Sequence, residues 1–310
     1  MRVLVTGAAG YLGSILCEHL LNAGHEITAL DSLLYGEPSL FHLCHSERFA
    51  FVRGDVRDEG LMRELLAGAD VILPLAAIVG ATACDRDPLQ ATSVNLDSAR
   101  LLNRLRGRDQ LVVFPVTNSG YGTKSGETHC TEDTPLEPIS LYGQTKVQAE
   151  EELLSKGPTI TLRLATVFGM SPRMRLDLLL NHFTYVAVTE GYIVIFEKDF
   201  KRNFIHVRDV ADCFLHAMDH GEAMAGRAYN AGLDDANLSK EELALAVKRC
   251  VPEFYIHFSE IGSDPDKRNY IVSNLRLREA GFEASRSINM GISELVKGFS
   301  MMPRGIFKNC

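Results

Sequence analysis

The sequence predicts an α/β fold, a doubly wound parallel sheet with a smaller α/β region toward the C-terminal end. Short apolar runs alternate with amphipathic segments through the first half of the chain, as expected of buried parallel strands connected by helices. A glycine-rich turn at residues 7–13 follows the first run, and the alternation becomes less regular after about Gly169. We therefore expect a large sheet domain over residues 1–169. Residues 170–310 are expected to form mainly a second domain, from which some segments return to the first.

Each expected element follows from a run of β-branched and apolar residues or from apolar residues at helical spacing. The expected strands are Arg2–Thr6, Glu26–Leu30, Phe49–Gly54, Asp70–Ala76, Gln110–Val116 and Thr159–Val167. The expected helices are Tyr11–Ala23, Leu89–Leu105 and Leu141–Ser155. In the second domain, weaker patterns cover Arg173–Leu180, Phe204–Val207, Val210–His220 and Leu243–Val251. We expect this region to lie against the carboxyl edge of the sheet, where doubly wound folds bind their ligands.

The composition is that of an ordinary globular protein, because 46% of the 310 residues are hydrophobic and 23% are charged. No apolar run reaches the ~20 residues that cross a bilayer, and the N-terminal residues do not resemble a signal peptide, so we expect a cytoplasmic protein. The net charge is −8 and the basic residues are scattered, which disfavours nucleic-acid binding. The 7 cysteines include no C-x-x-C pair, so neither a disulfide framework nor a metal site is expected.

The glycine-rich turn has the spacing of a dinucleotide-binding site. Gly7 permits a tight turn, Gly10 lets the backbone approach a pyrophosphate, and Gly13 allows close packing of helix and strand. Amide groups at the helix N-terminus then face the phosphates. Asp31, which follows the second expected strand, can accept both hydroxyls of the adenosine ribose and would repel a 2′-phosphate, which favours NAD over NADP. The alternative for Asp31 is a residue that caps a turn.

Two further segments are candidates for the same site. Asp55-Val56 follows the third strand, where the carboxylate can accept a hydrogen bond from the adenine amino group. The alternative for Asp55 is an exposed loop aspartate. Leu75-Ala76-Ala77 ends the fourth strand with small residues that let the chain pass beneath the pyrophosphate. Core packing explains these alanines almost as well.

Tyr142 and Lys146 lie four residues apart on an expected helix and so point in the same direction. A tyrosine is a poor base at neutral pH because its pKa is near ~10. A neighbouring ammonium group and a nicotinamide cation favour the phenolate and bring it toward useful strength as a general base. Lys146 can also hold the nicotinamide ribose, and Thr117, after the fifth strand, offers a hydroxyl to the same substrate oxygen. For the tyrosine–lysine spacing alone, an exposed helix face is the alternative.

Together these motifs resemble the extended short-chain dehydrogenase/reductase family, and the resemblance covers nearly the whole chain. It includes segments 202–210 and 229–232 and Arg268. Members of this family are NAD-dependent epimerases, dehydratases and dehydrogenases of nucleotide sugars, built on a Rossmann domain. The resemblance thus implies a nucleotide-diphosphate sugar as substrate. The cofactor contacts that it implies are Gly7, Gly10, Tyr11, Leu12, Gly13, Asp31, Asp55, Val56, Leu75, Ala76, Ala77, Asn95, Tyr142 and Lys146.

Departures from the family pattern narrow the reaction. Members that are 4,6-dehydratases carry an Asp-Glu pair after the threonine of the catalytic loop, and members similar to GDP-fucose synthase carry a cysteine at the position of Ser119. This chain has Asn118 and Ser119 there, so dehydration and 3,5-epimerisation are disfavoured. What remains is chemistry at one carbon. A 4-epimerase returns the hydride to the other face of a 4-ketosugar, whereas a 4-dehydrogenase releases the ketosugar, and the Thr117, Tyr142 and Lys146 set serves both.

A finer resemblance favours the dehydrogenase. Residues 115–122, 163–179 and 264–268 are similar to the GDP-D-glycero-D-manno-heptose 4-dehydrogenases of capsule and surface polysaccharide synthesis, as are Thr117 and Thr166, where many family epimerases have serine and asparagine. This resemblance implies tightly bound NAD, held as NADH until an external keto acid such as 2-oxoglutarate reoxidises it. A UDP- or GDP-hexose 4-epimerase is the alternative. A non-catalytic NAD-binding protein is a third hypothesis.

Candidate substrate residues are cations of the second domain and polar side chains of the catalytic loop. Guanidinium groups match phosphate oxygens, and the candidates are Arg173, Arg175, Arg202, Arg208 and Arg268, of which Arg202 and Arg268 are favoured, followed by Arg175. Asn118 and Tyr121 are expected to contact the sugar. Asn181 is expected to contact the diphosphate, with a role on the helix surface as its alternative. His206, in an apolar run, is expected to be a satisfied core residue.

The family resemblance also implies a homodimer. Members commonly pair through the two helices expected here at Leu89–Leu105 and Leu141–Ser155, so that two copies form a four-helix interface. Ala149 and Leu153 are candidates for that interface. Packing against the sheet is their alternative.

Overall fold

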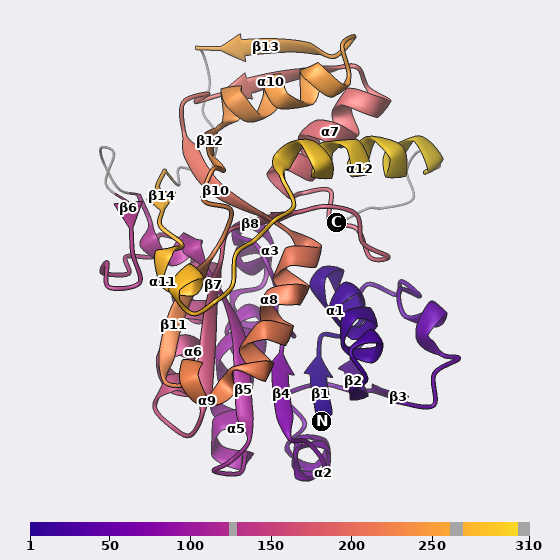
Figure 1. Ribbon diagram of the computed structural model, residues 1–310, viewed down its shortest axis with the longest axis vertical. Helices are drawn as coiled ribbons and strands as arrows, with labels where there is room; N and C mark the ends of the chain where they lie inside the picture. Colours follow the sequence, from indigo (N-terminus) through magenta and orange to yellow (C-terminus); the bar gives the residue numbers. More distant parts are fainter. Residues whose placement is uncertain (124–128, 261–268, 303–310) are drawn as a thin grey trace.

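A 7-stranded parallel sheet forms the centre of the larger part of the molecule (Figure 1). The computed structural model describes residues 1–123, 129–260 and 269–302. The strand order is β11-β7-β5-β4-β1-β2-β3, and every neighbouring pair is parallel. Because the chain leaves β1 toward β3 and returns to the other side of β1 at β4, the predicted doubly wound α/β class is confirmed. The strands are β1 (Arg2–Thr6), β2 (Glu26–Asp31), β3 (Phe49–Arg53), β4 (Val71–Pro74), β5 (Leu111–Thr117), β7 (Thr159–Leu164) and β11 (Arg227–Ala231).

Helices cover both faces of this sheet. One face packs against α2 (Glu59–Ala67), α5 (Ser98–Leu105) and α6 (Leu141–Leu154). The other face packs against α1 (Tyr11–Asn22) and α8 (Val207–Asp219), which also contact each other. Ala149 and Leu153 are fully buried in the core between α6 and the sheet, so packing against the sheet is the correct alternative for both. None of the helices in the described segments is long and apolar enough to span a membrane.

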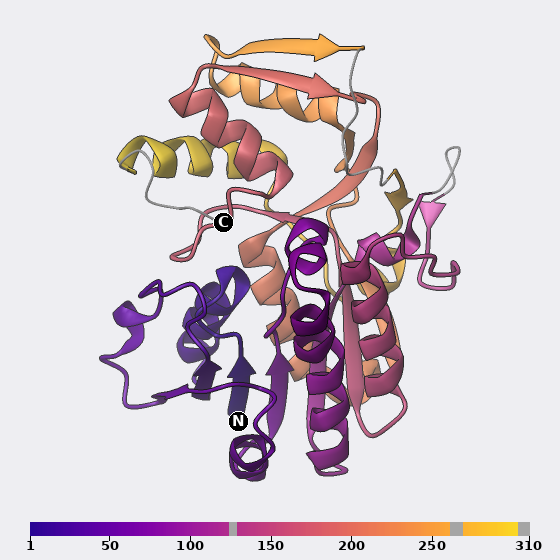
Figure 2. The ribbon, with the colours of Figure 1, turned by 180° about the vertical axis from the view of Figure 1, so that it is seen from behind.

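The smaller part of the molecule lies beyond the carboxyl ends of β1 and β4 (Figures 1 and 2). Three of its helices pack together: α7 (Leu179–Thr189), α10 (Lys240–Cys250) and α12 (Ile288–Met301). Its strands are β8 (Thr166–Phe168), β10 (Lys201–His206) and β12 (Asn237–Ser239) in one sheet, and β9 (Tyr192–Phe196) and β13 (Tyr255–Ser259) in another. β6 (His129–Cys130) pairs with β14 (Ile271–Val272).

Short helices connect other elements of the molecule. They are α3 (Ala81–Arg86), α4 (Pro88–Thr92), α9 (Gly221–Met224) and α11 (Leu275–Glu279).

Two of the elements expected over residues 1–169 differ by more than their end residues. The strand expected over residues 159–167 is divided at Ala165. The amide of Ala165 makes the last bond to the large sheet, to Ala231 O (2.9 Å), and from Thr166 the chain pairs with β10 in the three-stranded sheet. The helix expected over residues 89–105 is interrupted by a π-helical turn at Ser93–Asp97. Asn95, at the centre of that turn, bonds through its side chain to the backbone of the loop after β4. Both differences arise from contacts with distant parts of the chain.

Candidate active site

The glycine-rich turn between β1 and α1 is packed closely on two sides. Gly7 has a φ of +66°, and a Cβ atom there would lie 2.7 Å from the amide nitrogen of Ala76. A Cβ atom on Gly13 would lie only 2.4 Å from the carbonyl oxygen of Gly7. A side chain at either position would force the turn away from the loop after β4 or from α1. This is the geometry of a turn that brings its backbone close to a dinucleotide.

The N-terminus of α1 and the carboxylate of Asp31 fit NAD. Gly10 is the N-cap of α1, and within the described chain no side chain caps this end, so its first amide groups can bind a pyrophosphate. Asp31 accepts hydrogen bonds from the amides of Ala9 (2.9 Å) and Leu33 (2.8 Å). Because a carboxylate accepts about four hydrogen bonds, it retains capacity for the ribose hydroxyls. Bound at these residues, NAD supplies a hydride acceptor.

The loop after β4 borders the turn on the opposite side from α1. The amide of Ala76 donates to Thr6 Oγ1 (3.2 Å), which fixes the start of the loop. Asn95 accepts from the amide of Ile78 (2.8 Å) and donates to its carbonyl (3.0 Å) and to Thr145 Oγ1 (3.3 Å). The side chain of Asn95 is thus occupied by protein groups, which differs from the predicted contact with NAD. It supports the site by fixing the loop to α6.

Tyr142 and Lys146 lie in the first two turns of α6. Ser140 caps the helix by accepting from the amide of Gly143 (3.2 Å). Tyr142 is half-buried and packs with the apolar cluster of Ile78, Cys84 and Ala91. Lys146 is 3% exposed, and its Nζ lies 3.8 Å from the centre of the Phe114 ring. The exposed-face alternative for this pair is therefore wrong.

Burial lowers the pKa of Lys146 to about 7, against the opposing effect of the Glu150 carboxylate. In the cofactor-free protein the amine therefore loses its proton much more readily than an exposed lysine does. Its ammonium form favours a phenolate on a tyrosine at the same helix face. The pair can thus act as a general base together with its electrostatic partner.

The catalytic loop follows β5 as a 3-10 helix, η3 (Asn118–Tyr121), beside the start of α6. Thr117 Oγ1 donates to Ser119 Oγ (2.9 Å) and accepts from the Ser119 amide (3.1 Å). Asn118 is 1% exposed, and neither its Nδ2 nor its Oδ1 has a hydrogen-bond partner among the described residues. A buried amide without partners costs free energy. A polar ligand group beside Thr117 would remove that cost.

Arg175 is the described arginine candidate whose charge acts on Tyr142. Its Nε donates to Asp177 Oδ1 (3.1 Å), and its Nη2 lies 4.0 Å from the position that a Cβ atom of Gly80 would occupy. Burial acts to lower the pKa of Arg175, but the charge and hydrogen bond of Asp177 outweigh it, with a smaller contribution from Tyr142, so that the pKa is raised. A permanent cation thus lies between the loop after β4 and the loop after β8.

The side chains of Tyr121 and Asn181, predicted to contact the sugar and the diphosphate, are occupied by other protein groups. Tyr121 is fully buried, and its hydroxyl donates to Asn230 Oδ1 (2.7 Å). Asn181 is also fully buried, and it donates to Tyr11 OH (3.2 Å) and Arg175 O (3.0 Å) while it accepts from the amide of Gly169 (3.0 Å). These side chains hold the catalytic loop and the Arg175 loop in place. They have little capacity left for a sugar or a diphosphate.

The remaining predicted cofactor residues lie at the start of α1 or in the segment after β3. The hydroxyl of Tyr11 donates to Gly169 O (2.7 Å) and accepts from Asn181 Nδ2 (3.2 Å), so the hydroxyl is occupied by protein groups. Leu12 is half-buried and Val56 is buried. The carboxylate of Asp55 is bound by Arg57 (2.6 Å), whose hydrogen bonds lower the pKa of Asp55. A contact between Asp55 and adenine stays a prediction.

Two of the other cationic candidates, Arg202 and Arg208, lie in or next to β10. Arg202 is buried in β10, and Arg208 lies 4.0 Å from Glu18 at the start of α8. Arg268 lies outside the described residues. His206 is 1% exposed, accepts from the amide of Arg208 (3.2 Å) and bonds to Glu294 (2.8 Å). The prediction that His206 is a satisfied core residue is confirmed.

A buried network of charged and polar side chains lies between α6 and β7, and it was not predicted from the sequence. Glu150, one turn after Lys146, accepts from Thr161 Oγ1 (2.6 Å) and from Arg163 Nε (3.1 Å). Arg163 Nη1 also donates to the hydroxyl of Tyr121 (3.3 Å). The network ties α6, β7 and the catalytic loop together. Its signal in the sequence is a glutamate on a buried helix face and an arginine inside an apolar strand, each of which needs a partner.

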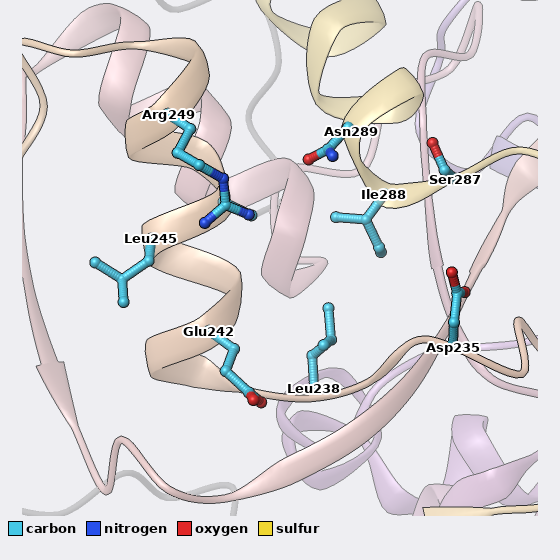
Figure 3. A pocket seen from close by; sticks show the side chains of 9 residues that line it. Asp235, Leu238, Glu242, Leu245, Arg249, Ser287, Ile288 and Asn289 are labelled. Carbon is cyan, nitrogen blue, oxygen red and sulfur yellow. The ribbon is translucent and has the colours of Figure 1, made fainter.

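An open hollow of about 360 Å³ lies in the smaller part of the molecule, between α10 and the start of α12 (Figure 3). Arg249 and Glu242 reach into it from α10, opposite Ile288 and Asn289 of α12 (Figure 3). None of the predicted cofactor or catalytic residues lines this hollow. It is therefore separate from the site around Tyr142.

Comparisons with known proteins agree with this geometry. Residues 3–232 match the model of the family described as the NAD dependent epimerase/dehydratase family. A Bacillus subtilis protein named uncharacterized UDP-glucose epimerase YtcB is 34% identical over 225 residues, 67% of this chain and 70% of that protein. A UDP-glucose 4-epimerase of Mycolicibacterium smegmatis is 30% identical over 319 aligned residues, 96% of this chain and 98% of that protein.

Solved structures show the same fold. The UDP-glucuronic acid 4-epimerase of Bacillus cereus, in complex with UDP-glucuronic acid and NAD, has a TM-score of 0.86 at 24% identity and covers 97% of this chain and 99% of its own. The UDP-glucose 4-epimerase of Thermotoga maritima has a TM-score of 0.83 at 22% identity and covers 97% of this chain and 99% of its own. With the family match over residues 3–232, the chain belongs to the NAD-dependent epimerase/dehydratase family of enzymes, which act on nucleotide sugars with NAD as cofactor.

Proposed function

We propose that this enzyme oxidises C4 of a nucleotide-activated sugar, and that the substrate is GDP-D-glycero-D-manno-heptose in the synthesis of a capsular or other surface polysaccharide. The observation that carries the proposal is the combination of Thr117, Tyr142 and Lys146 with a loop that has Asn118 and Ser119 where an elimination would need an acid and a base. Neither side chain can transfer protons as a carboxyl group does. The site is therefore equipped for chemistry at one carbon.

Each residue has a distinct role in this proposal. The phenolate of Tyr142 removes the proton of the C4 hydroxyl, and the ammonium form of Lys146 favours that phenolate. Thr117 donates a hydrogen bond to the same oxygen, and the orphaned amide of Asn118 pairs with a neighbouring hydroxyl of the sugar. NAD, when held by the glycine-rich turn and Asp31, would supply the acceptor for the hydride from C4. Arg175 balances the negative charge of the diphosphate.

The resemblance of residues 163–179 to the GDP-heptose 4-dehydrogenases supports release of the ketosugar. The enzyme would then retain NADH until an external 2-oxo acid such as 2-oxoglutarate takes up the hydride at its carbonyl carbon and a proton from the Tyr142 hydroxyl at its carbonyl oxygen, which gives the 2-hydroxy acid and restores NAD and the phenolate. A 4-epimerase acting on a UDP- or GDP-hexose is the second candidate. It is favoured by the names of the two relatives described above, both UDP-glucose epimerases.

The test uses the enzyme as purified and follows the absorbance band of reduced nicotinamide. GDP-heptose is added first and 2-oxoglutarate second. We expect a band that disappears with 2-oxoglutarate and a ketosugar that accumulates over many turnovers. If the absorbance band does not respond to the keto acid, and UDP- or GDP-hexoses are converted to sugars with the inverted configuration at C4, the enzyme is an epimerase. Tyr142→Phe is the control for bound cofactor without turnover.

A further inference from the structure

The segment Leu33–Ser39, which we call the strap, leaves the end of β2 and returns to the glycine-rich turn. Its first amide, that of Leu33, donates to Asp31 Oδ1 (2.8 Å). At its other end Ser39 Oγ donates to Ala9 O (2.8 Å). Leu34 and Tyr35, in the middle, are 56% and 55% exposed. The middle of the strap thus buries little apolar surface, whereas Leu33 packs against the core and polar contacts fix both ends.

The loop between β8 and α7, residues 169–178, is fixed to the other side of the same turn. Ser171 Oγ donates to Tyr11 O (2.7 Å) and lies 3.0 Å from Ser14 Oγ. The hydroxyl of Tyr11 donates to Gly169 O (2.7 Å). The strap and this loop therefore hold the backbone at Ala9 and Tyr11, on either side of Gly10, the N-cap of α1.

Arg173 joins the two segments directly. Its Nε lies 3.3 Å from Glu37 Oε2, and the two side chains are only 6% and 23% exposed. Its Cζ lies 4.2 Å from the centre of the Tyr35 ring, within the range of a cation–π interaction. Figures 1 and 2 show the loop after β8 reaching the segment that follows β2. Removing one partner of an ion pair that is shielded from water leaves the other charge unpaired, which costs more free energy than at the surface.

We propose that Arg173 and Glu37 form a latch that closes the strap beside the N-terminus of α1 and slows the release of NAD. The latch connects the strap, which starts from the ribose-binding carboxylate of Asp31, with the loop that carries Arg175. A cofactor held by Asp31 and the amides of α1 is enclosed when the pair is made. Arg173 is thereby a positioning residue for the cofactor instead of a ligand of the sugar diphosphate. The proposal depends on NAD as the cofactor and on no particular sugar.

The test measures how fast bound NADH leaves the full-length enzyme. The protein is loaded with NADH, and the loss of its fluorescence is followed after addition of excess NAD. Glu37→Gln removes the charge of the latch, and Tyr35→Ala removes the aromatic contact at an exposed position. Glu241→Gln is the matched control, because it breaks the Lys198–Glu241 pair (2.9 Å) in the smaller part of the molecule. Urea unfolding of each variant checks that the protein is folded.

We expect release from Glu37→Gln to be about 10-fold faster or more, since loss of one member of a buried pair acts mainly on dissociation. Tyr35→Ala should release NADH faster by a smaller factor, and Glu241→Gln at the parent rate. With Arg173→Met present, Glu37→Gln should add no further acceleration, because coupled partners are not additive. Parent-like release from both Glu37→Gln and Tyr35→Ala would overturn the proposal. So would independent, multiplying effects of Glu37→Gln and Arg173→Met.

Discussion

Lys146 lies under the ring of Phe114, and burial lowers its pKa from 10.5 to about 7. Between about pH 7 and roughly pH 10 the unfolded chain therefore binds more protons than the folded one, and stability rises with pH in that window. Below about pH 7 the amine is charged in both states, so the full cost of burying it is present. We expect Lys146→Met to stabilise the cofactor-free protein at pH 6 by about 1–3 kcal/mol, and by less at pH 9.

The measurement is the urea midpoint of parent and variant at both pH values. Lys297→Met, on the exposed side of α12, is the matched control, because it removes a charge that remains in water. An equal gain at pH 6 and pH 9 would mean that burial of the charged amine is not the cause. A loss of stability at pH 6 would mean that the ammonium group is better paired than the geometry indicates.

Tyr142→Phe keeps the aromatic ring in the cluster with Ile78 and Cys84 and removes only the hydroxyl. We expect turnover to fall by about 10²–10⁴-fold, the usual contribution of a general base. The NAD content and the urea midpoint should match those of the parent. Tyr185→Phe in α7, where the ring packs edge-on against Phe299 at 5.4 Å, should retain activity. Substantial turnover by Tyr142→Phe would refute its role as the base.

At this scale, the spacing along one strand, turn and helix predicted the close packing at Gly7 and Gly13. The spacing along a different helix, α6, predicted that Tyr142 and Lys146 are neighbours, and their roles in catalysis stay a prediction. The same chemistry did not predict the roles of Tyr121 and Asn181. Their hydrogen-bond partners come from segments far away in the chain, and a loop tyrosine has the same sequence pattern whether its hydroxyl meets a sugar or a buried network. Only the fold distinguishes the two.

The contact between α1 and the turn that precedes it depends on the absence of a side chain at Gly13. We expect Gly13→Ala to weaken NAD binding by about 10-fold or more and to destabilise the protein by about 1–3 kcal/mol, since a Cβ atom would lie 2.4 Å from Gly7 O. Gly60→Ala, within α2, is the control, because its nearest neighbour would be a side-chain oxygen at 3.4 Å. There the better helix propensity of alanine should be neutral or slightly stabilising. Calorimetric titration with NAD and urea unfolding distinguish the two, and equal affinities would contradict the packing argument.

Elements were predictable where the pattern was local. β1 has the expected bounds, and α1, β2 and α6 differ from theirs by a residue. The prediction omitted α2, although Asp58 is a good N-cap and does accept from the amide of Leu61 (3.0 Å). It could not foresee the break at Ala165 or the π-helical turn at Asn95. The first depends on the pairing of β8 with β10 and the second on the hydrogen bonds between Asn95 and Ile78, which the local sequence does not encode.

At the scale of the whole molecule, the site brings together the ends of several parallel strands and two loops. Asp31 ends β2, Thr117 ends β5, and Arg175 follows β8. The carboxyl ends of neighbouring parallel strands lie at one edge of the sheet. The sequence was therefore sufficient to predict that Asp31 and Thr117 lie at that edge. Arg175 could only be placed as one of several arginines, since the loop after β8 takes its position from Tyr11 and Asn181.

The predicted homodimer can be tested on the exposed side of the helices that carry this site. α4 and α5 lie beside α6, and Leu89 at the start of α4 is 85% exposed. Ala91, two residues later, is fully buried in the cluster that contains Tyr142. A partner that packs against Leu89 would therefore contact a helix that itself packs against α6. An aliphatic side chain this exposed gains free energy when a symmetric copy covers it.

We therefore expect a dimer in light-scattering measurements and a dissociation constant that rises about 10-fold or more in Leu89→Arg, because the interface would have to bury a charge. Leu245→Arg, at a leucine of α10 that is 41% exposed, is the control and should leave the mass unchanged. If monomeric Leu89→Arg retains its NAD but loses turnover, the interface also stabilises the active position of α6. A parent protein that is monomeric at all concentrations, or a Leu89→Arg variant that dimerises like the parent, would show that this face is not the interface.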